Sequence, residues 1–237
     1  MLKQALTLIL ICCAAYSFAQ TSFVNFSAGT AAYKGSLSSA YAAPGPMFNL
    51  GVVIAKNKRL NGNFQIGGGE ISYGAYQAAT NSASNRANTF FSTRFYSFSY
   101  QLRYNFFLYK RHIAYAAAGI GLLRYSPEDE NGNKLINRPE TRALGEEYSE
   151  VMTFLPLTAT YQYKLPKQWR AGVSVGYLNL NGTHFDNIDQ LGRRRDNLFT
   201  AQVILQIPLK SNTEEVKVGP VNSAPDFNQG IKENTPE

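Results

Sequence analysis

Hydrophobic and polar residues alternate along most of the chain, and the stretch Phe95–Phe106 is the clearest case. From Tyr96 to Phe106 every second residue is aromatic or leucine, and the intervening residues are Ser, Gln, Arg or Asn. A period of two over this length predicts a β-strand with one apolar face and one polar face. The same alternation recurs along the chain and predicts about eight strands, near residues 22–32, 47–56, 60–73, 93–107, 113–125, 149–164, 169–178 and 197–209.

The predicted connections between strands alternate between short and long. The short ones are 57–58, 108–112 and 165–168, and the long polar ones are 33–46, 74–92, 126–148 and 179–196. Short turns at one end and long loops at the other are typical of barrels of the outer membrane. We therefore expect an all-β fold, an eight-stranded antiparallel up-and-down transmembrane β-barrel with an apolar outer face and a polar lumen.

The two ends of the chain differ in composition from the strands. Residues 1–19 read as a signal peptide, with Lys3, an apolar run and the sequence Ser17-Phe18-Ala19 before the expected cleavage point. Residues 20–209 then form the barrel, with both termini in the periplasm. Residues 210–237 are polar and carry three lysines and five carboxylates, so we expect a disordered periplasmic tail. Both docking on a periplasmic partner and a purely solvated appendage remain open for this tail.

Two groups of residues are candidates for particular positions in such a barrel. Aromatic rings near the short turns predict a girdle at the membrane interface, because amphipathic rings prefer the headgroup level. Polar residues on the other face of the strands are expected to fill the lumen, which in an eight-stranded barrel is just wide enough for side chains. The girdle candidates are Tyr104, Phe106, Tyr109, Tyr161, Tyr163 and Trp169, and the lumen candidates are Gln65, Gln101, Arg103, Gln162, Arg170 and Gln202.

Composition and motifs argue against several kinds of chemistry. The formal charge is +7, but Lys and Arg are scattered over turns and loops, so binding of nucleic acid is not expected. Both cysteines, Cys12 and Cys13, lie in the signal peptide, and no thiolate metal site follows. The Asp129–Asn133 segment has the wrong glycine spacing for a calcium-binding EF-hand and predicts a turn. We expect no cofactor, no metal and no enzymatic activity.

Several blocks of the sequence carry a resemblance to a known family. They include YKGSLSSAYAAPGPMFNLGV in the first part, FFSTRFYSFSYQLRYNFFLYK from Phe90, YAAAGIGLLRYSP from Tyr115 and FLPLTATYQYKLPKQWRAGVSVGY from Phe154. The chain resembles a family of outer-membrane barrels that includes the PorG component of the type IX secretion system. The resemblance implies a non-enzymatic anchor in outer-membrane lipid that contacts periplasmic ring proteins of the secretion apparatus. It implies no catalytic residues.

Three alternatives remain beside this interpretation. A small outer-membrane barrel could act in adhesion or membrane integrity through its long loops. A lipid-modifying enzyme would need a base, for which His184 in the last long loop is the candidate. A soluble ligand-binding barrel would place the apolar faces of the strands inside, and alternation alone does not say which face is concave.

Overall fold

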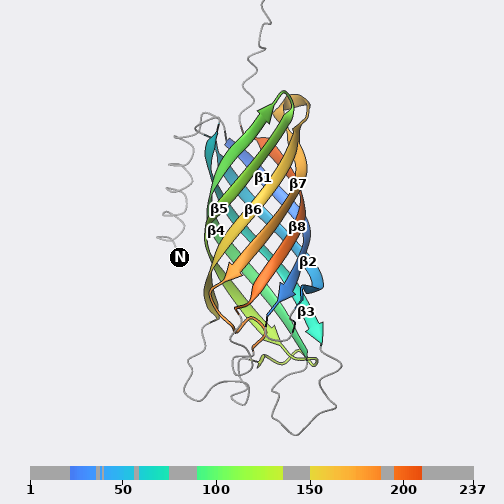
Figure 1. The fold of residues 1–237 in the computed structure, drawn as a ribbon. Helices are drawn as coiled ribbons and strands as arrows, with labels where there is room; N and C mark the ends of the chain where they lie inside the picture. Colours follow the sequence, from blue (N-terminus) through green and yellow to red (C-terminus); the bar gives the residue numbers. More distant parts are fainter. Residues whose placement is uncertain are drawn as a thin grey trace, which may run out of the picture.

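Eight antiparallel strands close into a barrel in which each strand pairs with the next along the chain and β8 pairs with β1 (Figure 1). The computed structural model describes residues 22–35, 38, 40–55, 59–74, 90–135, 150–187 and 195–209. The predicted fold class is confirmed, and each of the eight predicted strands is present. The strands are β1 (Ser22–Lys34), β2 (Ala42–Ile54), β3 (Leu60–Gly74), β4 (Phe90–Tyr109), β5 (His112–Glu128), β6 (Val151–Lys164), β7 (Arg170–Leu180) and β8 (Asn197–Pro208).

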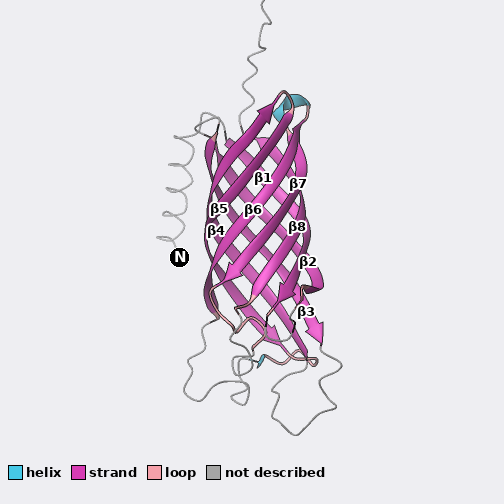
Figure 2. Ribbon diagram, in the orientation of Figure 1, coloured by secondary structure: helices cyan, strands magenta, loops and turns pink. Residues whose placement is uncertain are grey.

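The two ends of the barrel differ in their connections. The turn end, at the top of Figure 1, carries the connections from β2 to β3, β4 to β5 and β6 to β7. The outer ends of β1 and β8 also meet there, since the Leu209 amide donates to the Ser22 carbonyl at 2.8 Å. The 3₁₀ turn η4 (Pro166–Gln168) caps this end (Figure 2), and no helix of the described residues is long and apolar enough to cross a membrane. The opposite end, the loop end, carries the other connections.

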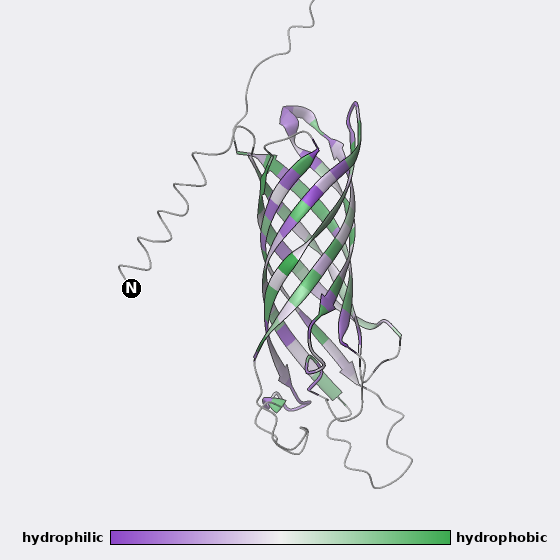
Figure 3. Cartoon of the chain, turned by 60° about the vertical axis from the view of Figure 1, so that its left-hand side comes forward, coloured by the Kyte–Doolittle hydropathy of each residue, from purple (hydrophilic) through white to green (hydrophobic). Residues whose placement is uncertain are grey.

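Side chains alternate between the outer wall and the lumen as the sequence pattern predicts. Phe48 is 61% exposed and Val203 66% exposed on the outer wall, whereas their neighbours Asn49 and Gln202 face inward. The alternation is regular in β5 as well, where Ile120 and Leu122 point outward. Figure 3 shows the resulting mixture of apolar and polar residues along each strand. Large apolar side chains therefore cover the outside, which is the reverse of a soluble ligand-binding barrel.

The strands extend further at the loop end than their sequence pattern predicts. β2 begins at Ala42 instead of residue 47, β4 begins at Phe90 instead of 93, and β5 runs to Glu128 instead of 125. Most outward positions of these extensions hold Pro, Ser or Glu, and Phe90 is the one large apolar residue among them, so a continuous apolar outer stripe does not mark them. The predicted strand ends were wrong here because the criterion was a lipid-facing stripe, whereas backbone pairing continues beyond it.

The lumen has two layers of opposite character. Toward the turn end it is mostly polar, as expected, with Asn, Gln, Ser and Arg side chains beside a few buried apolar ones such as Phe23, Val53 and Ile113. Toward the loop end the inward positions become apolar and form a buried cluster, so the expectation of a polar lumen throughout was wrong. The members of this loop-end core include Tyr33, Met47, Ile71, Phe91, Phe95, Leu123, Tyr125, Leu135, Phe154, Leu180, Phe185 and Leu198.

Candidate functional site

The loop-end mouth of the barrel is closed by the segment 181–187, which follows β7 and turns inward. Its Phe185 is 0% exposed and packs against three rings of the barrel wall. The centroid of the Phe185 ring lies 6.0 Å from that of Tyr33, 5.8 Å from that of Phe95 and 6.1 Å from that of Tyr125. The segment is thus anchored by an aromatic side chain that sits in the loop-end core.

Hydrogen bonds from β4, from β1 and from Asp196, the residue before β8, hold Phe185 and Asp186 in place. Thr93 Oγ1 of β4 donates to the Phe185 carbonyl at 2.7 Å. The Phe185 amide donates to Asp196 Oδ2 at 2.9 Å, and the Tyr33 hydroxyl donates to both Asp186 and Asp196. Buried carboxylates are costly unless they accept hydrogen bonds, and these bonds meet part of that need. The arrangement holds the plug segment (residues 181–187) in one position across the mouth.

A second segment at the loop end joins the plug. Asn187 Nδ2 donates to the Leu135 carbonyl at 3.4 Å, and Leu135 is itself fully buried in the core. Just before Leu135, Asp129 Oδ1 accepts the backbone amides of Asn131 and Asn133 at 2.9 and 2.8 Å. This geometry confirms the predicted turn, because the carboxylate caps the backbone of its own loop.

The outer wall at the loop end carries two ion pairs. Arg94 Nε lies 3.5 Å from Glu70 Oε2, between β4 and β3. Arg124 Nη2 lies 2.9 Å from Glu150 Oε2, next to the beginning of β6. Neither carboxylate points into the lumen. The pairs mark where the apolar outer wall ends, and they belong to the rim that surrounds the closed mouth.

The structure places the lumen candidates on the inner face of the barrel. Arg103 is 1% exposed and crosses the lumen from β4, donating to Asn105 Oδ1 at 3.0 Å and to Gln162 Oε1 and Gln206 Oε1 at 3.4 Å. Gln101 Nε2 donates to Gln65 Oε1 at 3.2 Å. Asn49 Nδ2 donates to Gln202 Oε1 at 3.1 Å, which links β2 to β8. The guanidinium of Arg170 lies 3.9 Å from the centroid of the Phe23 ring.

All of the girdle candidates lie on the outer wall in the half of the barrel next to the turn end. Two of their hydroxyl groups have polar partners at the same height on the wall. Arg59 Nη1 lies 3.4 Å from the Tyr104 hydroxyl, and His112 Nδ1 is hydrogen-bonded to the Tyr161 hydroxyl. A ring with its hydroxyl toward polar groups and its body on an apolar wall suits a membrane interface. The exposed candidates are Tyr104, Phe106, Tyr109, Tyr161, Tyr163 and Trp169.

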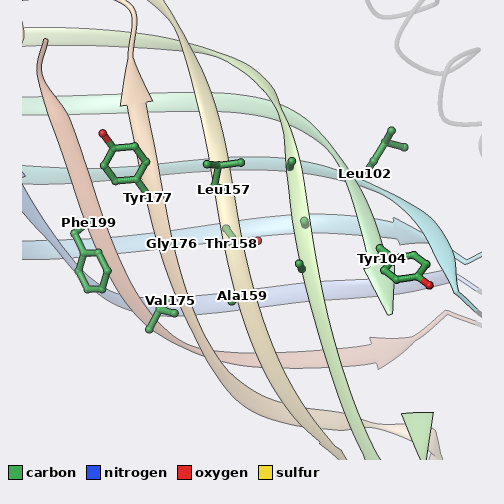
Figure 4. A pocket seen from close by; sticks show the side chains of 12 residues that line it. Leu102, Tyr104, Leu157, Thr158, Ala159, Val175, Gly176, Tyr177 and Phe199 are labelled. Carbon is green, nitrogen blue, oxygen red and sulfur yellow. The ribbon is translucent and has the colours of Figure 1, made fainter. Parts of the chain in front are cut away.

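The same wall has a shallow apolar groove of about 540 Å³ between these rings and the middle of the barrel (Figure 4). Its floor is formed by small residues of β5 and β6, such as Ala116, Ala118 and Ala159. Larger side chains, among them Tyr104 and Phe199, flank it. The lining is almost wholly apolar, which suits a position on a lipid-facing wall.

His184 lies in the plug segment with its Nδ1 3.4 Å from Thr183 Oγ1. A nucleophile and its base ordinarily lie closer than this, within about 2.6–3.2 Å. Within the described part of the chain, no group of three or more His, Cys, Asp or Glu residues could hold a metal ion.

The sequence pattern did not reveal the loop-end core or its plug. The sequence did contain a signal for the core. By the same period of two, inward positions of β4 and β5 are occupied by Phe91, Phe95, Leu123 and Tyr125. The role of Phe185 had no such signal, since it lies outside any strand.

Comparisons with known proteins agree with this geometry. The family model described as "Outer membrane protein beta-barrel domain" matches residues 5–193. The structure of Neisserial surface protein A aligns at 15% identity with a TM-score of 0.51, covering 78% of this chain and 96% of that one, which shows a shared fold.

Weaker structural likenesses include two other barrels. Ail of Yersinia pestis, in complex with the heparin analogue sucrose octasulfate, aligns at 11% identity and TM-score 0.45 over 79% of this chain and 98% of its own. The outer membrane enzyme PagL aligns at 17% identity and TM-score 0.40 over 78% and 99%. Among curated proteins, none matches the chain. With its closed eight-stranded barrel, its apolar outer wall and a family match over most of its length, this chain belongs to the outer membrane protein β-barrel domain family.

Proposed function

We propose that this outer-membrane barrel is a non-enzymatic scaffold that displays its long loops at the cell surface, for adhesion or for the integrity of the membrane. The observation that carries the proposal is the closed mouth. Phe185 and the hydrogen bonds around it hold the segment after β7 inside the barrel. The loop end is therefore a closed surface that supports the loops, and not the opening of a channel. The lumen below it is occupied by side chains, Arg103 foremost.

The proposal includes an orientation, with the loop end outside the cell and the turn end in the periplasm. Outer-membrane barrels generally carry long loops outside and short turns in the periplasm. The ion pairs of Arg94 and Arg124 on the rim also suit a surface in contact with water. Accessibility of a cysteine introduced at Ser72 to a membrane-impermeant maleimide on intact cells tests this orientation, with Lys110→Cys at the turn end as the matched control.

The function itself is tested by deleting the gene in the native host and restoring it in two forms. One is the full chain, and the other has residues 75–89 and 136–149 each replaced by a short Gly-Ser linker. Attachment of cells to surfaces and survival in bile salts are the readouts. We expect the full chain to restore the lost phenotype and the loop-shortened chain to fail while still inserting. Equal rescue by both forms would contradict the proposal.

A second candidate is anchoring of a type IX secretion apparatus through the turn end and the tail. Its support is the resemblance of the blocks around residues 33–52 and 90–110 to the barrel family that contains the PorG component. Secretion of type IX cargo by the deletion strain, complemented with the full chain or with a chain ending at Leu209, is the relevant assay. Normal secretion without the gene would exclude this role, whereas loss of secretion would favour it over surface display.

The non-enzymatic part of the proposal has a separate test. A lipid-modifying enzyme based on His184 would lose its product in the variant His184→Ala. We expect the lipid profile of the outer membrane to be the same with the wild-type chain, with His184→Ala and with the gene deleted. A lipid species that disappears in both altered strains would show an enzyme.

A further inference from the structure

The polar lumen near the turn end holds two arginine side chains, and none of the described residues supplies an acidic partner to them there. Arg103 of β4 and Arg170 of β7 both point inward and lie close enough to repel each other. Lys164, opposite Arg170 in the register of β6 and β7, adds a third cation at this end. No Asp or Glu occupies an inward position of the described strands in this half of the barrel. Buried charge without a counter-charge is costly, so the site calls for an anion.

The hydrogen-bond donors around Arg103 point to the same conclusion. Gln162 and Gln206 are fully buried, and each turns its Oε1 toward the guanidinium of Arg103. Their Nε2 atoms, together with Nε of Arg170, are buried without a hydrogen-bond partner among the described residues. Gln206 and Arg170 face each other in the register of β7 and β8, so these donors belong to one layer of the lumen.

Acceptors in this layer are too few to satisfy the donors. Asn25 Oδ1 is buried without a partner, and Asn25 lies opposite Gln206 in the register of β1 and β8. This oxygen can therefore accept one hydrogen bond from an N–H group of the layer. The donors of Gln162 and Arg170 remain, and so do both positive charges. An oxyanion offers several acceptor lone pairs as well as the missing charge, and guanidinium groups match carboxylate and phosphate oxygens in geometry.

Aromatic rings pack against both guanidinium groups of this layer. The Arg103 guanidinium lies 3.6 Å from the centroid of the Tyr115 ring, and that of Arg170 lies 3.9 Å from the centroid of the Phe23 ring. Arg103 already donates through Nε, Nη1 and Nη2 to side chains of this layer, so only the second N–H of Nη1 and of Nη2 is left over. Arg170 Nε has no hydrogen-bond partner among the described residues, and Arg170 is the first residue of β7, next to the turn end.

We propose that this layer is a binding site for an oxyanion, a carboxylate or a phosphate, held by Arg103, Arg170 and the amide groups of Gln162 and Gln206. Two sources of that chemistry exist. One is a small anion from solution. The other is a carboxylate of the segment 210–237, because Glu214 and Glu215 follow Leu209 by five and six residues, and an extended chain covers roughly 3.3 Å per residue.

The experiment measures the thermal unfolding midpoint of the refolded barrel in detergent against inorganic phosphate, and separately against acetate. Ionic strength is held constant with sodium chloride, which supplies no oxyanion. The full chain and a chain ending at Leu209 are compared, each with the variant Arg170→Gln. Arg124→Gln, which removes the same charge from the outer rim, is the matched control. Arg170→Gln carries the test because Arg103→Gln removes three hydrogen bonds and can fail to fold.

A ligand that binds only the folded state raises the midpoint with concentration until the site saturates. We expect such a saturating rise for the shortened chain and for its Arg124→Gln variant, and its loss in Arg170→Gln. A rise in the full chain as well identifies a free anion as the occupant. A rise only in the shortened chain, with the full chain already more stable, identifies the carboxylates of the tail. No rise in the shortened chain, or an equal rise in Arg170→Gln, overturns the proposal.

Discussion

At the scale of single residues, the plug depends on Phe185 more than on any other described side chain of its segment. Its ring is completely buried, and its backbone amide and carbonyl are both hydrogen-bonded. We expect Phe185→Ala to lower the free energy of unfolding by about 3–5 kcal/mol, as for other large aromatic truncations in a core. Urea titration of the barrel in lipid vesicles measures this change.

The control for Phe185 is Phe199→Ala on the outer wall, where the ring is exposed. That variant should change stability less, because the Phe199 ring is 42% exposed and has one aromatic neighbour, Tyr41, at 5.8 Å between centroids, whereas the Phe185 ring is enclosed by three. Limited proteolysis tests whether the plug is released in Phe185→Ala, since release exposes the backbone around residues 181–187 to cleavage. An unchanged stability in Phe185→Ala would show that the segment is not anchored by its ring.

Gly29 illustrates how closely the strands approach in the lumen. A Cβ at this position would lie 2.0 Å from the Ala201 carbonyl oxygen on the neighbouring strand β8, and backbone cannot move aside cheaply. We expect Gly29→Ala to destabilise the barrel by roughly 1–3 kcal/mol through overpacking, measured by the same urea titration. Gly182→Ala, whose Cβ would meet Met152 Cε at an ordinary 3.5 Å, should be tolerated.

At the scale of elements, the hairpin between β4 and β5 reverses the chain at Lys110 and Arg111. Lys110 has a φ of 48°, a left-handed conformation that costs a residue with a side chain roughly 1–2 kcal/mol. We expect Lys110→Gly to fold at least as stably as the wild type, since relief of strain offsets the added freedom of the unfolded chain. Lys110→Val should be destabilised, because a β-branched residue fits this conformation worst.

Refolding yield and the unfolding midpoint in detergent check the hairpin variants. Arg111→Val serves as the control, since Arg111 does not share the positive φ of its neighbour. Equal stability of Lys110→Gly and Lys110→Val would show that the turn relaxes to another conformation.

The elements also show how far sequence alone could lead. The period of two predicted the strands and which way their side chains face. An apolar outer stripe such as that of Tyr96–Phe106 recurs in the other strands of the barrel. The loop-end extensions were missed because most of their outward residues are Pro, Ser or Glu, whereas large apolar residues such as Phe91 lie at inward positions there. The position of Phe185 depends on contacts with residues far away in the sequence, and local periodicity carries no information about them.

At the scale of the whole molecule, the lumen and the outer wall of the barrel differ in character between the two ends. Next to the turn end the lumen is polar and the outside apolar, whereas at the loop end the lumen is apolar and the outside carries ion pairs. Both layers are filled by side chains. The barrel is therefore expected to be a closed cylinder without a continuous water path.

This closure predicts the electrical behaviour of the protein. In planar lipid bilayers we expect no sustained single-channel current from the wild-type barrel, because ions would have to cross the loop-end core around Phe95, Phe154 and Phe185. The double variant Phe95→Ala and Phe185→Ala removes two rings from this barrier and should give transient openings. The Phe199→Ala variant, altered only on the outside, should stay silent. A stable current from the wild type would contradict the closed lumen.

The length of β4 gives the loops a height above the bilayer. β4 has 20 residues, and residues 90–95 lie beyond its apolar outer stripe at the loop end. At about 3.3 Å per residue and a tilt near 45°, they raise the rim by roughly 15 Å. In the orientation proposed above, this extension holds the loops at that height outside the bilayer. A large binding partner on that side can then contact the loops without touching the hydrocarbon layer.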